Sequence, residues 1–127
     1  MASYKIPENE ITSVHDNLVT GIRDYMDNHS FKKALVGLSG GVDSAVTCCL
    51  AAEAAGAKNI LGLSMPSRYS SPESEEYART LAGNLDIDFK VVPIDPIYKA
   101  YLSVLDKDLA GKEAEEVEVY HQNLQAR

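Results

Sequence analysis

The sequence predicts an α/β fold in which helices cover a parallel β-sheet. Three short apolar runs of the length of buried strands are separated by longer segments, whose apolar residues recur every three or four positions. This alternation is typical of parallel sheets, because parallel strands need a crossover connection that is usually helical. We therefore expect a three-layer α-β-α arrangement with right-handed crossovers, in which the pattern stops after three strands.

The first half of the chain predicts a helix, a strand and a second helix. A helix is expected over residues 10–29, because an apolar stripe suited to burial recurs along it. The stripe consists of Ile11, Val14, Leu18, Ile22, Tyr25 and Met26. Residues 34–38 predict a strand buried on both faces. Helix-forming residues follow from Asp43, and Gly56 is well placed to end that helix in a left-handed conformation.

The second half repeats this pattern with different residues. Strands are expected over residues 60–63 and 89–94, and Ser71 with Pro72 supplies the cap and first residue of the helix between them. Asp95 and Pro96 do the same for a later helix that ends near residue 111. Its apolar face is formed by Ile97, Tyr101, Leu105 and Leu109. A last helix with an acidic end is expected over residues 112–127.

Composition restricts the possible classes of protein. A chain of 127 residues with 45% hydrophobic and 24% charged residues fits one soluble globular domain. Nineteen acidic residues against 12 basic ones give a net charge of -7, which disfavours nucleic acid as a partner. No apolar run approaches the ~20 residues that span a bilayer, and no secretory signal is recognisable, so we expect no membrane partner and a cytoplasmic location. The adjacent Cys48 and Cys49 are expected to be core thiols.

A glycine-rich turn lies between the first expected strand and the helix that follows it. The free N–H groups of a helix's first turn bind anions, and glycines allow an anion to approach the backbone closely. Ser39 and Ser44 add hydroxyl donors, and Asp43 is a candidate magnesium ligand between protein and polyphosphate. The turn therefore predicts a site for a nucleotide polyphosphate. Its residues are Gly37, Leu38, Ser39, Gly40, Gly41, Val42, Asp43 and Ser44.

Residues 39–44, Ser-Gly-Gly-Val-Asp-Ser, resemble the pyrophosphate loop, or PP-loop, of the ATP pyrophosphatase superfamily. Residues 61–71 and 123–127 are similar to segments of NAD synthetases, especially of glutamine-dependent ones. The resemblance covers nearly the whole chain and implies the adenine nucleotide α-hydrolase fold. Residues 1–127 are thereby identified as a partial ATP pyrophosphatase domain, the N-terminal part of an NAD synthetase domain, with helix 10–29 ahead of the first strand.

The resemblance implies a ligase that uses ATP and Mg²⁺ to amidate deamido-NAD to NAD through an adenylate, with release of pyrophosphate and AMP. Ammonia and deamido-NAD would be the other substrates, and the full enzyme would be a homodimer. Leu63, Met65 and Arg68 would line the ATP pocket, and Arg127 would contact deamido-NAD. Residues 118–122 depart from the acidic-Thr-x-x-Asn pattern of the family. No residue is assigned a covalent catalytic role.

Other interpretations remain open at the level of sequence. The chain could be a non-catalytic ATP-binding module, or another PP-loop enzyme that forms GMP or thiolates tRNA. Arg68 could be a surface arginine. The three histidines are expected in surface or capping roles: His15, His29 and His121. Tyr98 and Tyr101 are expected in a helix core.

The sequence also predicts that the site is incomplete. A ligand site at a switch point of an open sheet needs a strand on each side of the crevice, and the strands expected here lie on one side of residues 35–38. The other edge of that strand would expose unpaired backbone groups. We therefore expect a fragment with little or no turnover, or a chain that pairs this edge with another chain. Ammonia would come from solution or from a further domain.

Overall fold

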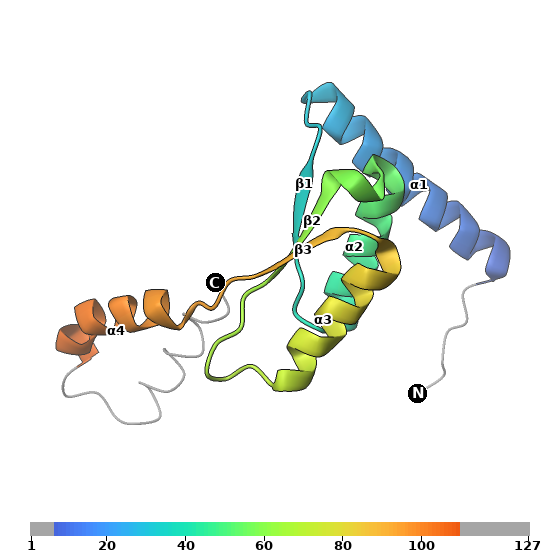
Figure 1. Ribbon diagram of the computed structural model, residues 1–127. Helices are drawn as coiled ribbons and strands as arrows, with labels where there is room; N and C mark the ends of the chain where they lie inside the picture. The colour runs from blue at the N-terminus through green and yellow to red at the C-terminus, as the bar shows by residue number, and fades with distance from the viewer. Residues whose placement is uncertain (1–6, 110–127) are drawn as a thin grey trace.

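The computed structural model describes residues 7–109 and contains four α-helices and three strands in this part of the chain (Figure 1). In chain order the elements are α1 (Glu8–Asn28), β1 (Ala34–Gly37), α2 (Val42–Ala55), a 3-10 turn η1 (Ala57–Asn59), β2 (Ile60–Ser64), α3 (Pro72–Leu85), β3 (Asp88–Val91) and α4 (Asp95–Leu109). The predicted alternation of strands and helices is confirmed. The expected helix over residues 112–127 lies outside the described residues.

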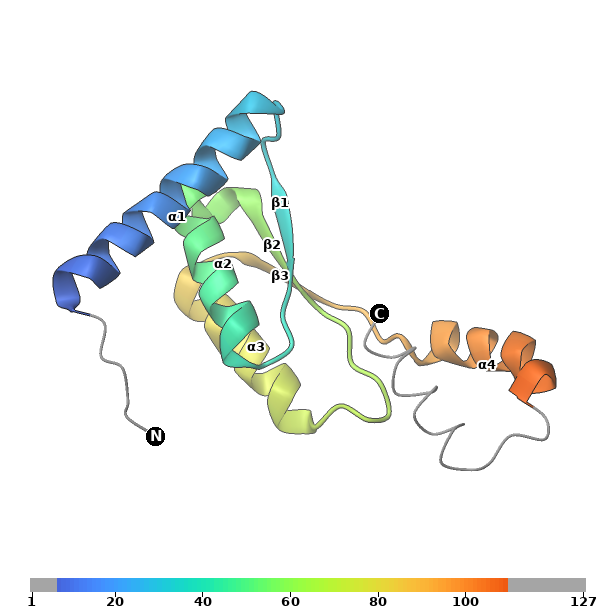
Figure 2. The same ribbon diagram turned by 180° about the vertical axis from the view of Figure 1, so that it is seen from behind.

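The three strands form one parallel sheet in the order β1-β2-β3. Ala34 of β1 is opposite Ile60 of β2, and Leu61 of β2 is opposite Asp88 of β3. Helix α2 packs on β1 and β2, helix α3 packs on β2 and β3, and α1 packs on α2. Both views of the ribbon place α1, α2 and α3 on the same side of the sheet (Figures 1 and 2). This is expected when successive right-handed crossovers add strands in one direction.

The core lies between the sheet and the helices α2 and α3. It consists of Val36, Leu38, Cys48, Ala51, Ile60, Ala78, Ala82 and Ile87. A Cβ at Gly62 would lie 2.8 Å from Leu38 Cδ1, so the missing side chain at this position leaves room for Leu38. Burial raises the pKa of the Cys48 thiol, which agrees with a core role for this residue. Cys49 is exposed instead, because it follows Cys48 on the helix and faces another direction.

The strand β1 is covered on one face by the described residues, not on both as predicted. Val36 is buried against the helices, whereas Leu35 is 60% exposed. Successive side chains of a strand point to opposite faces, and α2 and α3 lie on the same face. Leu35 therefore projects from the bare side of the sheet.

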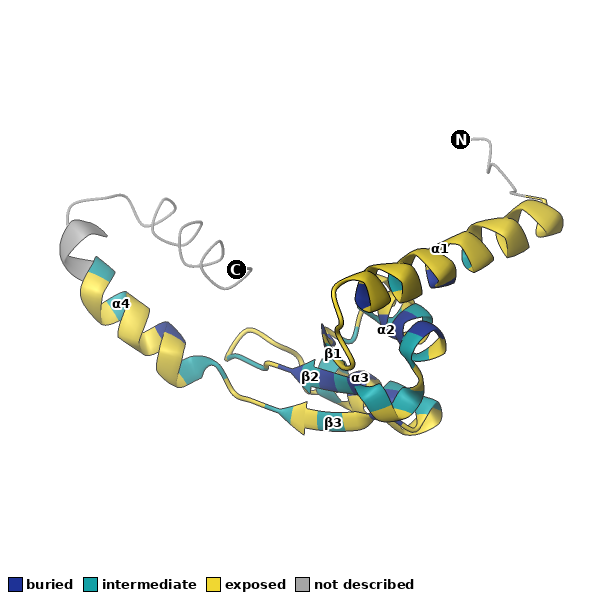
Figure 3. Cartoon of the chain, turned by 90° about the horizontal axis from the view of Figure 1, so that it is seen from above, coloured by how far each residue is buried: buried dark blue, intermediate teal, exposed yellow. Residues whose placement is uncertain are grey.

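The N-terminal half of α1 extends past the helix on which it packs. At 1.5 Å per residue, the 21 residues of α1 span about 31 Å and the 14 residues of α2 about 21 Å. Val19 and Met26 are buried, but four members of the predicted apolar stripe are about half exposed: Ile11, Val14, Leu18 and Tyr25. Figure 3 shows that most of α1 is exposed toward its N-terminus. The helix itself was predicted correctly, but the burial of its whole stripe was not.

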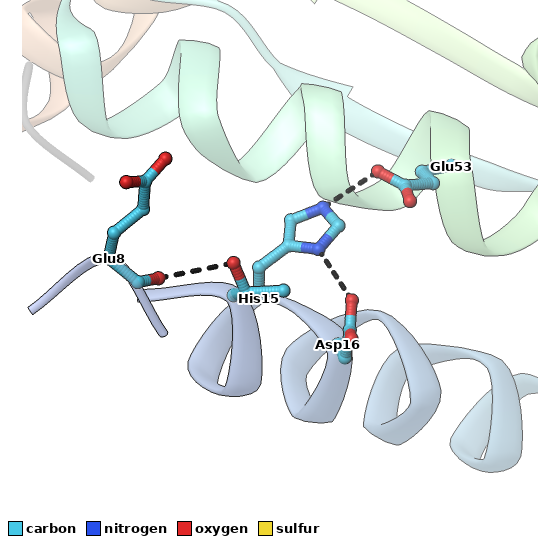
Figure 4. A network of polar contacts seen from close by, with 5 residues as sticks. Glu8, His15, Asp16 and Glu53 are labelled. Atoms are coloured by element: carbon cyan, nitrogen blue, oxygen red, sulfur yellow. Dashed lines mark hydrogen bonds and ion pairs between the residues drawn. The ribbon is translucent and has the colours of Figure 1, made fainter. Parts of the chain in front are cut away.

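Polar contacts join α1 to α2 near the middle of α1. His15 Nε2 lies 2.8 Å from Glu53 Oε2 of α2, and His15 Nδ1 lies 3.0 Å from Asp16 Oδ1 (Figure 4). These hydrogen bonds, to Asp16 first and to Glu53 second, raise the pKa of His15. Arg23 Nε also donates to the carbonyl of Ala54 over 3.2 Å. His15 therefore has the predicted surface position, where it links two helices.

Helix α4 projects away from the sheet and the other helices (Figures 1 and 2). Two residues of its predicted apolar face are not buried, since Ile97 and Tyr101 are each 56% exposed. Tyr98 is the exception at 4% exposure, and its ring contacts Tyr69 in the loop that follows β2. The helix begins at Asp95, the residue predicted as its cap. None of the helices in residues 7–109 has the length and hydropathy needed to span a bilayer.

Candidate functional site

The carboxyl ends of β1 and β2 bring two groups of predicted site residues together. Gly37 is opposite Leu63 in the sheet register, and the amide of Leu38 donates to the carbonyl of Leu63 over 2.8 Å. A Cβ on Gly37 would lie 3.8 Å from Met65 Cε, so the Met65 side chain lies against the start of the glycine turn. Because parallel strands end at the same edge, these residues lie together at the carboxyl-end edge of the sheet, where open α/β sheets bind ligands.

The glycine turn adopts a backbone that requires glycine. Gly40 has a φ of +83°, in the region that L-residues with a side chain rarely adopt. A Cβ at Gly40 would lie 2.6 Å from the carbonyl oxygen of Ser74 in α3, closer than real atoms approach. The turn is therefore pressed against the first residues of α3. This close contact between the loop and α3 was not predicted, because it depends on how the two helices pack.

Helix α2 begins directly after this turn without a side-chain cap. Its N-cap residue is Gly41, in an extended conformation with φ of −91° and ψ of 165°, and it has no side chain that could cap the first N–H groups of the helix. The first N–H groups of a helix have no partner within the helix, and the helix dipole makes this end positive. The start of α2 can therefore receive an anion through its backbone.

Two hydroxyl groups hold the turn in shape. Ser44 Oγ accepts a hydrogen bond from the Ser39 amide at 3.1 Å and donates to the carbonyl of Gly41 at 3.2 Å. Ser39 Oγ lies 3.0 Å from Ser44 Oγ and accepts from the Gly41 amide at 3.2 Å. The hydroxyl of Ser44 has one hydrogen for the Gly41 carbonyl and Ser39 Oγ, so either serine can be the donor between the two hydroxyls. A phosphate oxygen at this site could accept hydrogen bonds from the Ser39 and Ser44 hydroxyls in place of the bond between them.

Asp43 is exposed in the first turn of α2. Its backbone carbonyl accepts from Thr47 Oγ1 at 2.9 Å, which fixes the backbone at this residue. Within residues 7–109 no cluster of three or more His, Cys, Asp or Glu side chains forms a cage for a metal. As a single carboxylate, Asp43 could hold a magnesium ion together with phosphate oxygens, since Mg²⁺ commonly takes one or two carboxylates together with substrate oxygens.

A cavity of about 290 Å³ lies beside the turn. Its lining comes from the glycine turn and the first turn of α2, and from α3 through Tyr77, Ala78 and Leu81. The contribution of α3 was missed at the level of sequence. The proline that begins α3 predicts the helix, but the residues that face α2 depend on the packing between the two helices.

Arg68 lies in the loop after β2 and is held by α4. The Arg68 amide donates to Asp95 Oδ1 at 3.1 Å. The Arg68 guanidinium carbon lies 5.1 Å from the ring centre of Tyr98 and 5.8 Å from that of Tyr69. Tyr98 thus contacts this loop and does not pack in a helix core as predicted. Arg127, the predicted contact to deamido-NAD, lies outside the described residues.

Comparison with known proteins agrees with this arrangement. The sequence model of the NAD synthase family matches residues 14–127. The glutamine-dependent NAD(+) synthetase of Thermotoga maritima is 46% identical over 110 residues, which are 87% of this chain and 19% of that protein. The NH(3)-dependent NAD(+) synthetase of Trichlorobacter lovleyi is 48% identical over 84 residues, which are 66% of this chain and 31% of that protein.

Solved structures confirm the α/β fold class. The glutamine-dependent NAD+ synthetase from Acinetobacter baumannii in complex with ADP superposes with a TM-score of 0.87 at 30% identity, covering 99% of this chain and 23% of that one. The NH3-dependent NAD synthetase from Campylobacter jejuni has a TM-score of 0.71 at 23% identity, covering 91% of this chain and 48% of that one, which shows a shared fold. The chain spans about a fifth of the length of the glutamine-dependent relatives, 19% and 22% for two of them. Since the family match extends over most of its residues, the chain belongs to the NAD synthase family.

Proposed function

We propose that this chain supplies the ATP-binding part of an enzyme that converts deamido-NAD to NAD. The observation that carries the proposal is the turn between β1 and α2, where Gly40, the uncapped start of α2 and two hydroxyls surround space for an anion. Family membership supports the choice of NAD synthesis among the reactions that use such a loop.

The proposed reaction has two steps. A carboxylate oxygen of the nicotinate group attacks the α-phosphorus of ATP, and the bond to the β-phosphate oxygen breaks, so pyrophosphate leaves and an adenylate forms. Ammonia then attacks the acyl carbon, AMP leaves with the electron pair of the broken C–O bond, and loss of a proton gives the amide. The protein's task in both steps is to orient the reactants and to stabilise the charge that develops on phosphate oxygens.

Four residues of the turn would bind the pyrophosphate part of ATP. Gly40 and Gly41 let phosphate oxygens approach backbone N–H groups, and the hydroxyls of Ser39 and Ser44 would exchange their mutual hydrogen bond for phosphate oxygens. Asp43 would hold Mg²⁺ together with those oxygens, and the ion would neutralise part of the charge on the leaving pyrophosphate. Leu63, Met65 and Arg68 would line the adenosine side. Arg127 would contact deamido-NAD.

Binding measurements test the role of the turn. We expect calorimetry to detect binding of both Mg²⁺-ATP and Mg²⁺-pyrophosphate to the chain, and chelation of Mg²⁺ to weaken both. Ser39→Ala should weaken both ligands by about 10- to 100-fold, because a hydrogen bond to a charged group is lost. Ser103→Ala on α4 is the matched control and should leave both affinities unchanged. Equal affinities for wild type and Ser39→Ala would contradict the proposed site.

Turnover tests the proposed reaction. Deamido-NAD labelled with ¹⁸O in its nicotinate carboxylate is incubated with ATP, Mg²⁺ and ammonia. The chain is present in excess over deamido-NAD. We expect slow formation of AMP that carries one ¹⁸O atom, because the carboxylate oxygen bonded to phosphorus leaves with AMP. Because the chain alone is expected to have little or no turnover, the full enzyme is assayed in the same way, and ATP binding without AMP formation there would identify a binding module. AMP without the label would exclude an acyl adenylate.

We also propose that the full enzyme is a homodimer in the cytoplasm, as the sequence resemblance implies. The exposed apolar residues of α1 support self-association, since burying such residues is favourable. Sedimentation equilibrium of the full enzyme at several concentrations tests the dimer, and cell fractionation tests the location.

A further inference from the structure

We propose that Tyr98 is a positioning residue, whose ring holds the Arg68 guanidinium in place for the adenosine part of ATP. The inference rests on the proposed function, in which Arg68 lines the ATP pocket. It assigns a role to helix α4, which the proposed reaction does not otherwise use. It also implies that the phosphate and adenosine parts of the nucleotide site are supported by different elements.

The side chains form a compact aromatic and cationic cluster. The guanidinium carbon of Arg68 lies 5.1 Å from the ring centre of Tyr98, within the range of a cation–π contact. Tyr69 and Tyr98 meet edge to face with ring centres 6.1 Å apart and planes at 90°, and their hydroxyls are 3.4 Å apart. Two rings therefore restrict the guanidinium from different directions.

The backbone fixes the same contact. The Ile94 amide donates to the Pro66 carbonyl at 3.0 Å, which continues the pairing beyond the ends of β2 and β3. The Arg68 amide donates to Asp95 Oδ1 at 3.1 Å, which joins the loop to the first residue of α4. Tyr98 lies one helical turn further, where its amide bonds to the Ile94 carbonyl at 2.9 Å. The start of α4 is thus anchored to the loop that carries Arg68.

Burial along α4 distinguishes Tyr98 from its neighbours. Tyr98 is 4% exposed, whereas Ile97, Tyr101 and Val104 of the same helix are each more than half exposed. A helix that buried its apolar face in a core would cover several of these side chains together. Tyr98 is therefore buried singly among these residues, at the point where α4 contacts Arg68 and Tyr69 of the loop after β2.

This arrangement predicts that the binding of ATP and the binding of pyrophosphate depend on partly different residues. Pyrophosphate would contact the glycine turn and α2, and α2 packs chiefly on α1, α3 and the strands β1 and β2. Only the nucleoside end of ATP would use the guanidinium that Tyr98 holds. A ring that holds the guanidinium before the ligand arrives reduces the side-chain freedom lost on binding.

The test compares ATP with inorganic pyrophosphate by calorimetry on the 127-residue chain in Mg²⁺. We expect Tyr98→Leu to weaken ATP by about tenfold, the size of a partly desolvated cation–π contact, and to leave pyrophosphate unchanged. Tyr98→Phe keeps the ring and should retain most of the ATP affinity. Tyr101→Leu is the matched control on the exposed part of α4 and should bind both ligands as wild type does.

A double variant shows whether Tyr98 acts through Arg68. In the Arg68→Ala background, Tyr98→Leu should cause no further loss of ATP affinity, because the group that it positions is absent. Losses that multiply, an unchanged ATP affinity for Tyr98→Leu, or equal losses for ATP and pyrophosphate would each overturn the inference. If the wild-type chain binds pyrophosphate but Arg68→Ala leaves ATP affinity unchanged, the inference alone fails. If wild type binds neither ligand, the proposed function fails as well.

Discussion

The hydroxyl groups of the turn after β1, at Ser39 and Ser44, bond to groups close to them in sequence. In the loop after β2, residues 65–71, Arg68 and Tyr69 contact a helix much further along the chain. Ser39 and Ser44, five residues apart, bond to each other and to the backbone between them. Arg68 and Asp95 are 27 residues apart, and Tyr69 and Tyr98 are 29 apart. The second loop also has a local turn, in which the Ser67 amide donates to Ser70 Oγ at 3.0 Å.

We interpret this difference as two kinds of structural support within the proposed nucleotide site. A site for phosphate needs N–H groups and hydroxyls, which a short motif supplies from its own backbone and side chains. A site for a base and a sugar needs larger side chains in defined positions, and long side chains need support from other elements. Substitutions at Ser39 or Ser44 should therefore change the first loop itself. The second loop should also change when residues of the distant helix α4 are substituted.

The largest effect is expected for Gly40→Ala. A left-handed backbone and a Cβ 2.6 Å from the Ser74 carbonyl oxygen together should cost about 2–5 kcal/mol of unfolding free energy. Urea unfolding measures the change. Gly21→Ala is the matched control, because a Cβ at Gly21 meets no atom within 4 Å, and it should stabilise α1 by about 0.5–1 kcal/mol. A neutral Gly40→Ala would show that the turn does not depend on this contact.

The next effect is expected for Ser44→Ala, which removes the acceptor of the Ser39 amide. The loss should be about 1–2 kcal/mol of local stability, seen as faster hydrogen exchange at the Ser39 amide. Exchange at the Arg68 amide should not change. Faster exchange at both amides would mean that the two loops open together.

A smaller effect is expected for Asp95→Ala, which removes the distant support of the second loop. The exposed hydrogen bond to the Arg68 amide should contribute about 0.5–1.5 kcal/mol, so exchange at that amide should accelerate while Ser39 is unaffected. Asp95→Asn retains an acceptor oxygen and should restore part of the protection. Unchanged exchange at Arg68 would show that the loop after β2 holds itself.

The smallest effect is expected away from both loops, at His15. Its pKa is raised in the folded protein by hydrogen bonds with Asp16 and Glu53, so protonated His15 adds stability below its ordinary value of 6.5, and this contribution is lost as pH rises through the raised pKa. The difference in thermal midpoint between wild type and His15→Gln should therefore shrink from pH 5.5 to pH 8. His29→Gln serves as the control. A constant difference would exclude a charged link between α1 and α2.

Much of the fold and the position of the turn proposed to bind phosphate could be predicted from sequence, because both depend on short-range patterns. Ser71 accepts from the Ser74 amide at the start of α3, and Gly56 ends α2 with a φ of +86°. The predicted strands were found within a few residues of their expected bounds, and Ser39, Gly40 and Ser44 lie at the strand-to-helix turn as predicted. Periodicity and capping are local properties, so the residues themselves predict them.

Other features depend on which elements meet in space. The apolar stripe of α1 predicted burial, yet burial required a neighbour as long as α1, and α2 is shorter. The apolar residues of α4 predict a helix packed in a core, but Tyr98 is buried against Arg68 in the loop after β2. Sequence spacing predicts which side chains can meet within one or two helical turns. Contacts between residues 27 positions apart, such as Arg68 and Asp95, depend on how the sheet and its crossovers pack.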